Sequence, residues 1–396
     1  MSTNIDPKKV EELLTRGVEE VIDKEHLRKK LLSGEKLRIK FGIDPTGSRI
    51  HIGHAVPLRK LRQFQELGHI VILLIGDYTA MVGDPSGRDQ TRPILSKEKI
   101  QENMKTYVDQ ASKVLDISKT EVRYNSEWFG APNFTQLIME LTSYITVARI
   151  LERDDFQKRL KEGSDIQMQE ILYPLLQGYD SVALKADVEI GGTDQKFNLL
   201  MGRKLQRKYE QEEQDILTLP VLEGTDGIKK MSKSFDNFIA VDDSPEDMFG
   251  KTMSIPDTVI FKYFELATEV PMEIVNEYKS EMEAGKNPRD IKMILASEIT
   301  RLYHGDEGVK RGLERFAAVI QGNEKPAEIP ELKPSSMDIV TVLVEAGFCS
   351  SKSDARRQIE GGGVKINDVV VEAQNIAPVR VGDIIQKGKR FFVKIK

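Results

Sequence analysis

The most regular hydrophobic pattern in the chain lies between residues 37 and 75. Over residues 37–43, apolar side chains occupy every second position, which is typical of a β-strand with one buried face. Residues 58–67 then repeat apolar positions at helical spacing, and Pro57 sits where a first helical turn tolerates proline. Residues 70–75 are apolar throughout, as in a parallel strand buried on both faces. This order predicts a strand–helix–strand crossover, a unit that binds ligands at the carboxyl ends of its strands.

The same pattern of strands and helices continues along the chain. Short apolar runs predict further strands at residues 121–124, 187–190 and 216–222. Helical spacing predicts one helix or two at residues 5–33, and further helices at 96–115 and 134–151. The segment 134–151 is more apolar than a surface requires, so it either packs internally or forms a subunit interface. Together these elements predict an α/β fold, a doubly wound (Rossmann-type) parallel sheet, over residues 1–240.

The pattern over residues 241–396 predicts three different segments. Residues 241–322 show helical spacing without strands, which indicates a separate α-helical domain. Residues 323–335 contain three prolines and predict a stiff linker. Residues 336–396 predict a small α+β domain of two helices followed by short strands.

Composition narrows the class of protein. With 396 residues, 39% hydrophobic and 31% charged, the chain is typical of a soluble protein of two or three domains. It has no apolar run of membrane-spanning length and begins with polar residues, so we expect a cytoplasmic protein without a membrane partner. The single cysteine, Cys349, excludes an intrachain disulfide and a cysteine-based metal cluster.

Charge is distributed unevenly along the chain. The net charge of −5 argues against indiscriminate binding to nucleic acid, because such binding depends on phosphate contacts. Residues 336–396, however, carry ten basic and seven acidic side chains, a balance of +3. Basic residues on a small helix-plus-sheet domain suit an RNA backbone, and the candidates are Lys352, Arg356, Arg357 and Lys365. The alternative is a charged but inert cap.

Candidate chemistry begins where the first predicted strand ends. A helix start favours anionic oxygens through its free N–H groups and its dipole, and Gly53 has no side chain to block a ligand. His51 and His54 lie on one side of this opening turn and could together donate hydrogen bonds to phosphate oxygens. An isolated pair of this kind is more often two surface or capping histidines. Here two of only five histidines follow an Asp-Pro-Thr turn, which favours function.

Three further segments bring polar residues to other parts of the predicted fold. Residues 76–88, rich in glycine, hydroxyl and carboxylate groups, favour a binding loop over a structural turn. Tyr173, Gln177 and Asp180 share one helix face, which either lines a pocket for a small polar ligand or is solvated. Residues 191–195 follow a strand with paired glycines and then Asp194, a pattern that lets a nucleotide approach and suits ribose hydroxyls.

A basic loop completes the set of candidates. Residues 227–234 place Lys230 and Lys233 three positions apart between small residues. Mobile lysines can follow the charge that grows on a leaving pyrophosphate. A solvated loop is the commoner role of such lysines, but the paired histidines elsewhere in the chain make it the poorer choice.

Two of these segments carry a family resemblance. His51-Ile52-Gly53-His54 and Lys230-Met231-Ser232-Lys233-Ser234 resemble the two signature motifs of class I aminoacyl-tRNA synthetases. The polar helix face, residues 191–195 and the loop with Thr79 and Asp84 resemble the bacterial tyrosyl-tRNA synthetases, and the tail resembles their S-four-type RNA-binding domain. The resemblance covers nearly the whole chain.

The resemblance implies a site for each substrate. The residues implied to bind tyrosine are Lys40, Gly42, Asp44, Thr79, Asp84, Asn125, Tyr173, Gln177, Asp180 and Gln195. Those implied to bind ATP are Gly42, Asp44, His51, Gly53, His54, Gly192, Asp194, Met231 and Lys233, and those implied to be catalytic are Thr46, His51, His54, Lys230 and Lys233. Lys40 departs from the better-known branch, which has a tyrosine here, and fits the second bacterial subtype. It shares its strand face with Gly42 and Asp44, so we expect it to point into the site.

The resemblance also implies a reaction and partners. Tyrosine would be activated by ATP, which enters with Mg²⁺ and without dedicated protein ligands for the metal, and then transferred to tRNA(Tyr). Residues 125–165 would form the interface of a homodimer, and residues 241–322 would recognise the anticodon. The alternatives are the related tryptophanyl enzyme, a small nucleotidyltransferase, and an RNA-binding protein that has lost catalysis.

Overall fold

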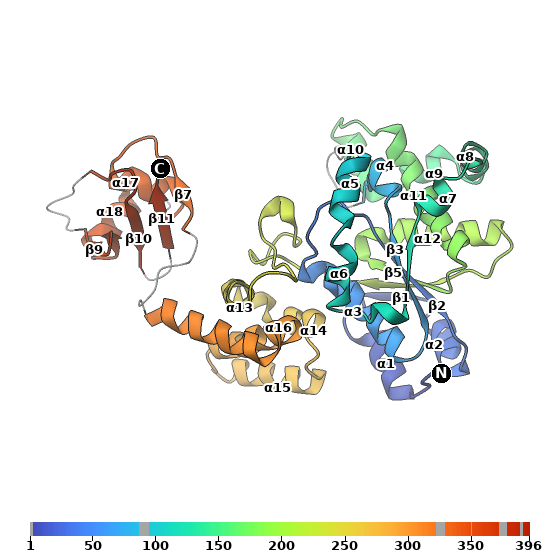
Figure 1. Cartoon of the computed structure of the whole chain (residues 1–396), viewed down its shortest axis with the longest axis horizontal. Coiled ribbons are helices and arrows are strands. Elements are labelled where there is room, and N and C mark those ends of the chain that lie inside the picture. Colours follow the sequence, from blue (N-terminus) through green and yellow to red (C-terminus); the bar gives the residue numbers. More distant parts are fainter. Residues whose placement is uncertain (1–2, 87–94, 322–328, 350, 372–377, 389–390) are drawn as a thin grey trace. The chain divides into compact units, whose positions relative to one another are not determined.

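The computed structural model describes residues 3–86, 95–321, 329–349, 351–371, 378–388 and 391–396. The chain forms two compact units, Met1–Gly305 and Asp306–Lys396, each described here by itself (Figure 1). The end of the predicted loop at residues 87–88, the first part of the linker at 323–328 and residues 389–390 of the tail lie outside the described residues.

The first unit is built on a mainly parallel sheet, and this confirms the predicted fold class. The order of its six described strands is β1-β6-β5-β2-β3-β4, and only the β1–β6 pair is antiparallel. Their bounds are β1 Glu20–Ile22, β2 Arg38–Ile43, β3 Ile70–Ile75, β4 Thr120–Tyr124, β5 Val188–Gly192 and β6 Asp215–Leu219. The sequence pattern did not predict β1, because three half-buried residues are too few to show an alternation.

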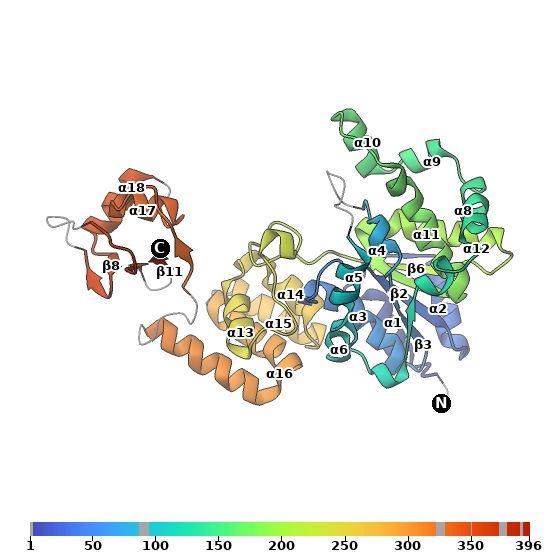
Figure 2. The ribbon, with the colours of Figure 1, turned by 45° about the horizontal axis from the view of Figure 1, so that its top comes forward.

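Helices cover both faces of this sheet. Alternate residues of β3 belong to two different cores: Leu73 packs in the cluster with α3 (Ile52–Glu66), whereas Leu74 packs with Leu184 of α11 (Met168–Leu184). α11 and α12 (Lys196–Lys208) run side by side (Figure 2). The other helices of this region are α1 Pro7–Thr15, α2 Lys24–Ser33, α4 Thr79–Val82, α5 Lys97–Met104, α6 Tyr107–Ser112, α7 Ser126–Phe129, α8 Phe134–Ser143, α9 Val147–Leu151 and α10 Asp154–Lys161.

Two helix predictions need correction. The segment 96–115 forms two helices, α5 and α6, because the chain turns at Lys105–Thr106. α3 begins at Ile52, a turn earlier than the apolar repeat suggested, so Pro57 lies inside the helix and not in its first turn. A proline there has no N–H to donate to the carbonyl of Gly53. The helix start therefore coincides with the histidine motif itself.

Residues 245–305 are helical and belong to the same compact unit as the sheet. The helices are α13 Pro245–Ser254, α14 Ile260–Ala267, α15 Met272–Glu283 and α16 Pro288–Gln321, and Gly305 interrupts α16 with φ 66° and ψ −171°. Ile260 and Phe264 of α14 lie in the core cluster that also contains α3. The absence of strands agrees with the sequence pattern, whereas the domain boundary at residue 240 stays a prediction.

The second unit contains its own sheet and core. Its strand order is β7-β11-β10-β8-β9, with bounds β7 Glu331–Leu332, β8 Val364–Ile366, β9 Val369–Val370, β10 Ile384–Lys387 and β11 Phe391–Ile395. The helices α17 (Ile339–Glu345) and α18 (Lys352–Glu360) pack on it through Leu343, Ile359 and Ile385. Ser351 caps α18 by accepting a hydrogen bond from the Asp354 N–H. Across the described chain, no helix is long and apolar enough to cross a membrane.

Candidate active site

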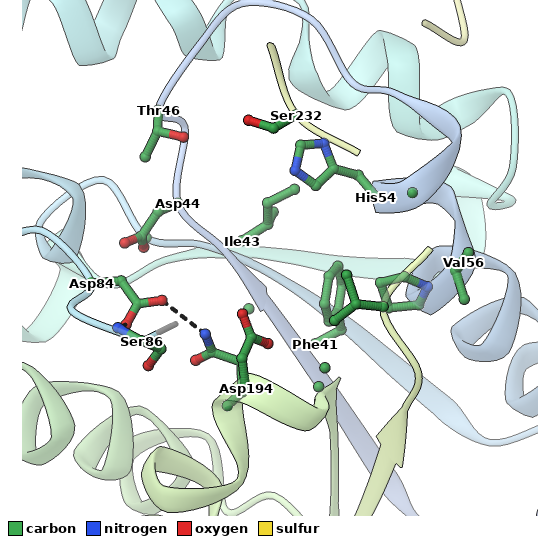
Figure 3. Close-up of a pocket in the computed structure, with 18 of the residues that line it drawn as sticks. Phe41, Ile43, Asp44, Thr46, His54, Val56, Asp84, Ser86, Asp194 and Ser232 are labelled. Atoms are coloured by element: carbon green, nitrogen blue, oxygen red, sulfur yellow. Dashed lines mark hydrogen bonds between the residues drawn. The ribbon is translucent and has the colours of Figure 1, made fainter. Parts of the chain in front are cut away.

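A cavity of about 750 Å³ opens at the carboxyl ends of β2, β3, β5 and β6. Figure 3 shows Thr46, Ser232 and His54 on one side of it and Asp84, Ser86 and Asp194 on the other. All the residues predicted for ATP and catalysis line this cavity, as do nine of the ten predicted for tyrosine. The exception is Asn125. Because the carboxyl ends of parallel strands share one edge, motifs far apart in the sequence converge here.

The two histidines form a stacked pair at the start of α3. His51 occupies the N-cap position, and its ring centroid lies 3.7 Å from that of His54. A Cβ on Gly53 would lie 3.0 Å from Nδ1 of His51, so glycine gives the rings this space. Nδ1 of each ring is buried and has no hydrogen-bond partner among the residues that the structure describes. The hydrogen-bonding capacity of these two nitrogens is therefore not used by the described protein groups.

Both imidazoles are neutral at physiological pH. Burial lowers the pKa of His54 to about 3, and the positive charges of Lys233 and Lys230 add to this effect. Burial also lowers the pKa of His51 strongly, together with the neighbouring His54 and Lys233. Neutral imidazoles can donate hydrogen bonds to a polyanion while leaving most of its charge to be met by the lysines.

The lysine loop lies directly against the histidine motif. Lys233 Nζ donates a hydrogen bond to the Arg49 carbonyl at 2.8 Å, and Lys230 Nζ lies 3.9 Å from Asp194 Oδ2. Beyond the loop, the Ile52 N–H donates to the Ile239 carbonyl at 2.9 Å. The two motifs are therefore neighbours, although about 180 residues separate them in the chain. Lys230 is exposed, but both lysines line the cavity beside the histidine motif, which favours a role at the site over an unrelated solvated loop.

The opposite end of the cavity is built around Asp180. The indole N–H of Trp128 donates to its carboxylate at 2.9 Å, and Nδ2 of Asn125 lies 3.4 Å from it. Burial raises the pKa of Asp180 to about 7, although Lys40, Trp128 and Asn125 act in the opposite direction. Asn125 is fully buried behind Thr79 and Asp180 and does not reach the cavity. Its prediction as a substrate ligand is corrected accordingly: Asn125 positions other side chains.

Lys40 reaches the floor of the cavity as predicted, but it is wholly buried and ion-paired. It lies directly across from Glu189 in the β2–β5 pair, and its Nζ is 2.9 Å from Glu189 Oε1. Sequence reasoning missed Glu189 and Trp128. The signal for Glu189 was present, because a carboxylate inside a buried strand needs a positive partner.

Hydrogen bonds between side chains hold the middle of the cavity. The Tyr173 hydroxyl donates to Asp44 at 2.9 Å, and Nε2 of Gln195 donates to Asp84 at 2.8 Å. Burial, and then the charge of Asp44, raises the pKa of Tyr173. Tyr173 and Asp180 are both buried and line the cavity, so the alternative of a solvated helix face is wrong.

Comparisons with known proteins agree with this arrangement. Residues 32–320 match the model of tRNA synthetases class I (W and Y), and residues 323–385 match the S4 domain. The tyrosine–tRNA ligase of Thermotoga maritima is 51% identical over 98% of both chains. The chain belongs to the tyrosine–tRNA ligase family of class I tRNA synthetases.

Other relatives of the family support this placement. The tyrosine–tRNA ligase of Carboxydothermus hydrogenoformans is 50% identical over 97% of both chains. Among solved structures, a truncated mitochondrial tyrosyl-tRNA synthetase of Aspergillus nidulans aligns with TM-score 0.66 and 23% identity, covering 78% of this chain and 94% of that one. The Archaeoglobus fulgidus tyrosyl-tRNA synthetase, solved with L-tyrosine, aligns with TM-score 0.63 and 24% identity, covering 78% and 100%. At these identities the structures show the shared fold.

Proposed function

We propose that this chain is a tyrosine–tRNA ligase. It activates L-tyrosine with ATP to give tyrosyl-adenylate and pyrophosphate, and then transfers the tyrosyl group to the 3′ end of tRNA(Tyr). The observation that carries this proposal is the convergence of the paired histidines and paired lysines at one end of the cavity that holds Asp180 at its other end.

The Asp180 end accommodates tyrosine. Asp180 accepts a hydrogen bond from the phenol, and Asp84, Tyr173 and Gln177 bind the ammonium group. Thr79 donates to Asp44 at 2.8 Å and so fixes the carboxylate that also holds Tyr173. A site that hydrogen-bonds a phenol rejects phenylalanine by about 10⁴–10⁵, because its polar groups would be left unpaired. With this discrimination between tyrosine and phenylalanine, the enzyme needs no editing domain.

The other end accommodates ATP. Gln195 lies where the tyrosine carboxylate meets the α-phosphate, while Gly192 and Asp194 approach the ribose and the backbone of Met231 approaches the adenine. The triphosphate, which enters with its Mg²⁺ as part of the substrate, is held by Thr46, His51, His54, Lys230 and Lys233. Among the described residues, no group of three or more His, Cys, Asp or Glu side chains could hold a metal ion of its own.

This arrangement suits in-line attack by the tyrosine carboxylate on the α-phosphorus of ATP. The nucleophile is already ionised, so the protein's work is to position the reactants and stabilise charge. Because Lys233 rests on the Arg49 carbonyl beside His51, its ammonium can move onto the leaving pyrophosphate, where interaction in the transition state counts most.

The remaining segments serve tRNA binding and assembly. Lys352, Arg356 and Arg357 are on or near the exposed side of α18, and Lys365 lies on β8, a placement suited to phosphate contacts. Residues 241–322 recognise the anticodon. Exposed apolar side chains on α8, α9 and α10 support a homodimer built on the 125–165 region, among them Met139, Val147 and Leu160.

Amino-acid-dependent exchange of pyrophosphate into ATP tests the proposal. We expect exchange with tyrosine and none with phenylalanine or tryptophan. Exchange with tryptophan alone would point to the tryptophanyl enzyme. An absence of exchange with every amino acid, together with intact tRNA binding, would instead indicate an RNA-binding protein that has lost catalysis.

A further inference from the structure

The ammonium group of Lys40 is held by three groups of the protein. Its Nζ lies 2.9 Å from Glu189 Oε1 in an ion pair and donates to Ser181 Oγ at 2.8 Å and to the Gln177 carbonyl at 3.2 Å. Two of the three N–H donors of the ammonium group therefore form hydrogen bonds inside the protein, and its charge is paired with that of Glu189. These contacts anchor Lys40 to the protein.

The ion pair is also poorly explained by stability alone. Lys40 is 0% exposed and Glu189 is 1% exposed, so both charges have lost their hydration. A buried pair of this kind is often no more stabilising than two apolar side chains of the same size. Further hydrogen bonds to Glu189 from Ser181 and Gln214 fix it in one position. The network holds a positive charge at a defined place beneath the cavity.

That place is beside Asp180. Ser181, which accepts from Lys40, is the next residue of α11, and Asp180, Lys40 and Glu189 all line the same cavity. The charge of Lys40 favours the ionised form of Asp180, whereas burial and the charge of Glu189 oppose it; the pKa of Asp180 is about 7. Other titratable groups that line this cavity near α11 are Asp44, directly after β2, Asp84, in the segment after α4, and Tyr173, on the same face of α11 as Asp180.

We propose that Lys40 is a positioning residue for tyrosine selection, and that it acts through Asp180. Its fixed charge favours the ionised form of the Asp180 carboxylate, and the ionised carboxylate accepts the hydrogen bond of the substrate's phenol. This inference rests on the proposed function, in which Asp180 is the phenol acceptor. It assigns the lysine an electrostatic role in place of a direct contact with the substrate.

The ionisation state matters for both affinity and selectivity. A hydrogen bond to a carboxylate is about twice as strong as one between neutral groups. A buried carboxylate that finds only the ring of phenylalanine is left without that partner, which disfavours the wrong substrate. Loss of the Lys40 charge should therefore weaken tyrosine binding at neutral pH, where Asp180 is balanced between its two forms.

The chain carries its own reporter for this titration. Trp128 is the only tryptophan, and its indole N–H donates to Asp180 Oδ1 at 2.9 Å. Ionisation of Asp180 changes the charge at the end of that hydrogen bond. Tryptophan fluorescence of the full chain, recorded against pH without substrate, should show a midpoint near pH 7. The midpoint should disappear in Asp180→Asn.

Two single variants should move this midpoint in opposite directions. Lys40→Met removes the charge that favours ionisation and should raise the midpoint by about one pH unit. Glu189→Gln removes the charge that opposes it and should lower the midpoint, with the double variant in between. A loss of packing alone would not shift the midpoint in opposite directions in the two variants. Lys30→Met, which breaks a distant pair with Glu212 at 2.7 Å, is the matched control and should leave the midpoint unchanged.

Kinetics of pyrophosphate exchange complete the test. In Lys40→Met the KM for tyrosine at pH 7 should rise about fivefold, the change in ionised fraction for a one-unit shift, and return to the wild-type value at pH 9. A raised KM that persists at pH 9, or a midpoint that does not move, would overturn the role of Lys40. If Asp180→Asn leaves the preference for tyrosine over phenylalanine intact, the assignment of Asp180 in the proposed function fails instead.

Discussion

The ring of His51 stacks on that of His54 with an interplanar angle of 21°, and both rings are uncharged because they are buried beside the lysine loop. Nδ1 of each ring has no hydrogen-bond partner among the residues that the structure describes. A pair of neutral donors placed beside two mobile ammonium groups is suited to a triphosphate whose charge shifts during the reaction.

Replacing one of these rings should affect turnover more than tyrosine binding. We expect His54→Ala to lower kcat for adenylate formation by about 10²–10³, the loss typical of removing one transition-state donor, with the KM for tyrosine unchanged. Single-turnover measurement of adenylate formation checks this. An equal rise in the KM for tyrosine would show that His54 serves substrate binding generally.

The same histidine makes stability depend on pH. The pKa of His54 is about 3 in the folded chain and about 6.5 in the unfolded chain, so the unfolded state binds more protons below pH 6.5. Stability is therefore lost as pH falls below 6.5 and is constant with respect to this group above it. Between pH 6.5 and pH 4.5, the free energy of unfolding of His54→Gln should fall by about 2 kcal/mol less than that of the wild type, as measured by denaturant unfolding. If the free energies of unfolding of the two proteins changed equally with pH, His54 would not be a buried neutral imidazole in the folded chain.

Gly47 makes room for the side chain of Lys233. A Cβ at this position would overlap the Nζ end of the Lys233 side chain, which is flexible and can move away. We expect Gly47→Ala to keep the thermal unfolding temperature but to lower kcat for exchange by about tenfold, since a displaced ammonium loses transition-state contact. Gly250→Ala is the control, because a Cβ there has nothing within 4 Å. Equal effects of the two variants would argue against a special role for Gly47.

The basic side of α18 should act on tRNA and leave the first reaction step unchanged. Arg356→Ala with Arg357→Ala should weaken tRNA binding and flatten its dependence on salt, while pyrophosphate exchange stays at the wild-type rate. Substitution of two exposed lysines of the first unit, Lys8 and Lys29, by alanine gives the matched loss of charge. If both pairs weaken tRNA binding equally, the effect is one of net charge and not of this surface.

Subunit association should depend on the exposed apolar side chains of the 125–165 region. Met139 is 68% exposed and Val147 is 56% exposed, and a glutamate at both positions should shift sedimentation from dimer toward monomer. Ile274→Glu on α15, 36% exposed, is the control outside the region. A species that remains dimeric with both glutamates would place the interface elsewhere.

The convergence of motifs could be predicted because it follows from topology. His51, Asp194 and Lys230 each stand just beyond a predicted strand, and parallel strands end at one edge of the sheet. Pairings across the sheet could not be predicted in the same way. Lys40 and Glu189 face each other only because β2 is registered against β5, and a shift of one residue would separate them.

Local deviations also escaped the sequence pattern. Pro57 was placed in the first turn of α3 because the apolar repeat begins only at Leu58, whereas the helix starts at Ile52, whose N–H donates to the Ile239 carbonyl. The family resemblance implied that Asn125 binds tyrosine, yet its side chain turns inward to Thr79 and Asp180. The direction in which a polar side chain points depends on neighbours that only the fold provides.

The central claim is that one cavity holds tyrosine at Asp180 and ATP at the paired histidines and lysines. A crystal structure of the full chain with a non-hydrolysable tyrosyl-adenylate analogue tests it most directly. We expect the phenol oxygen within hydrogen-bond distance of Asp180 and the ribose beside Gly192 and Asp194. An analogue bound with its ring away from Asp180, or outside this cavity, would contradict the account.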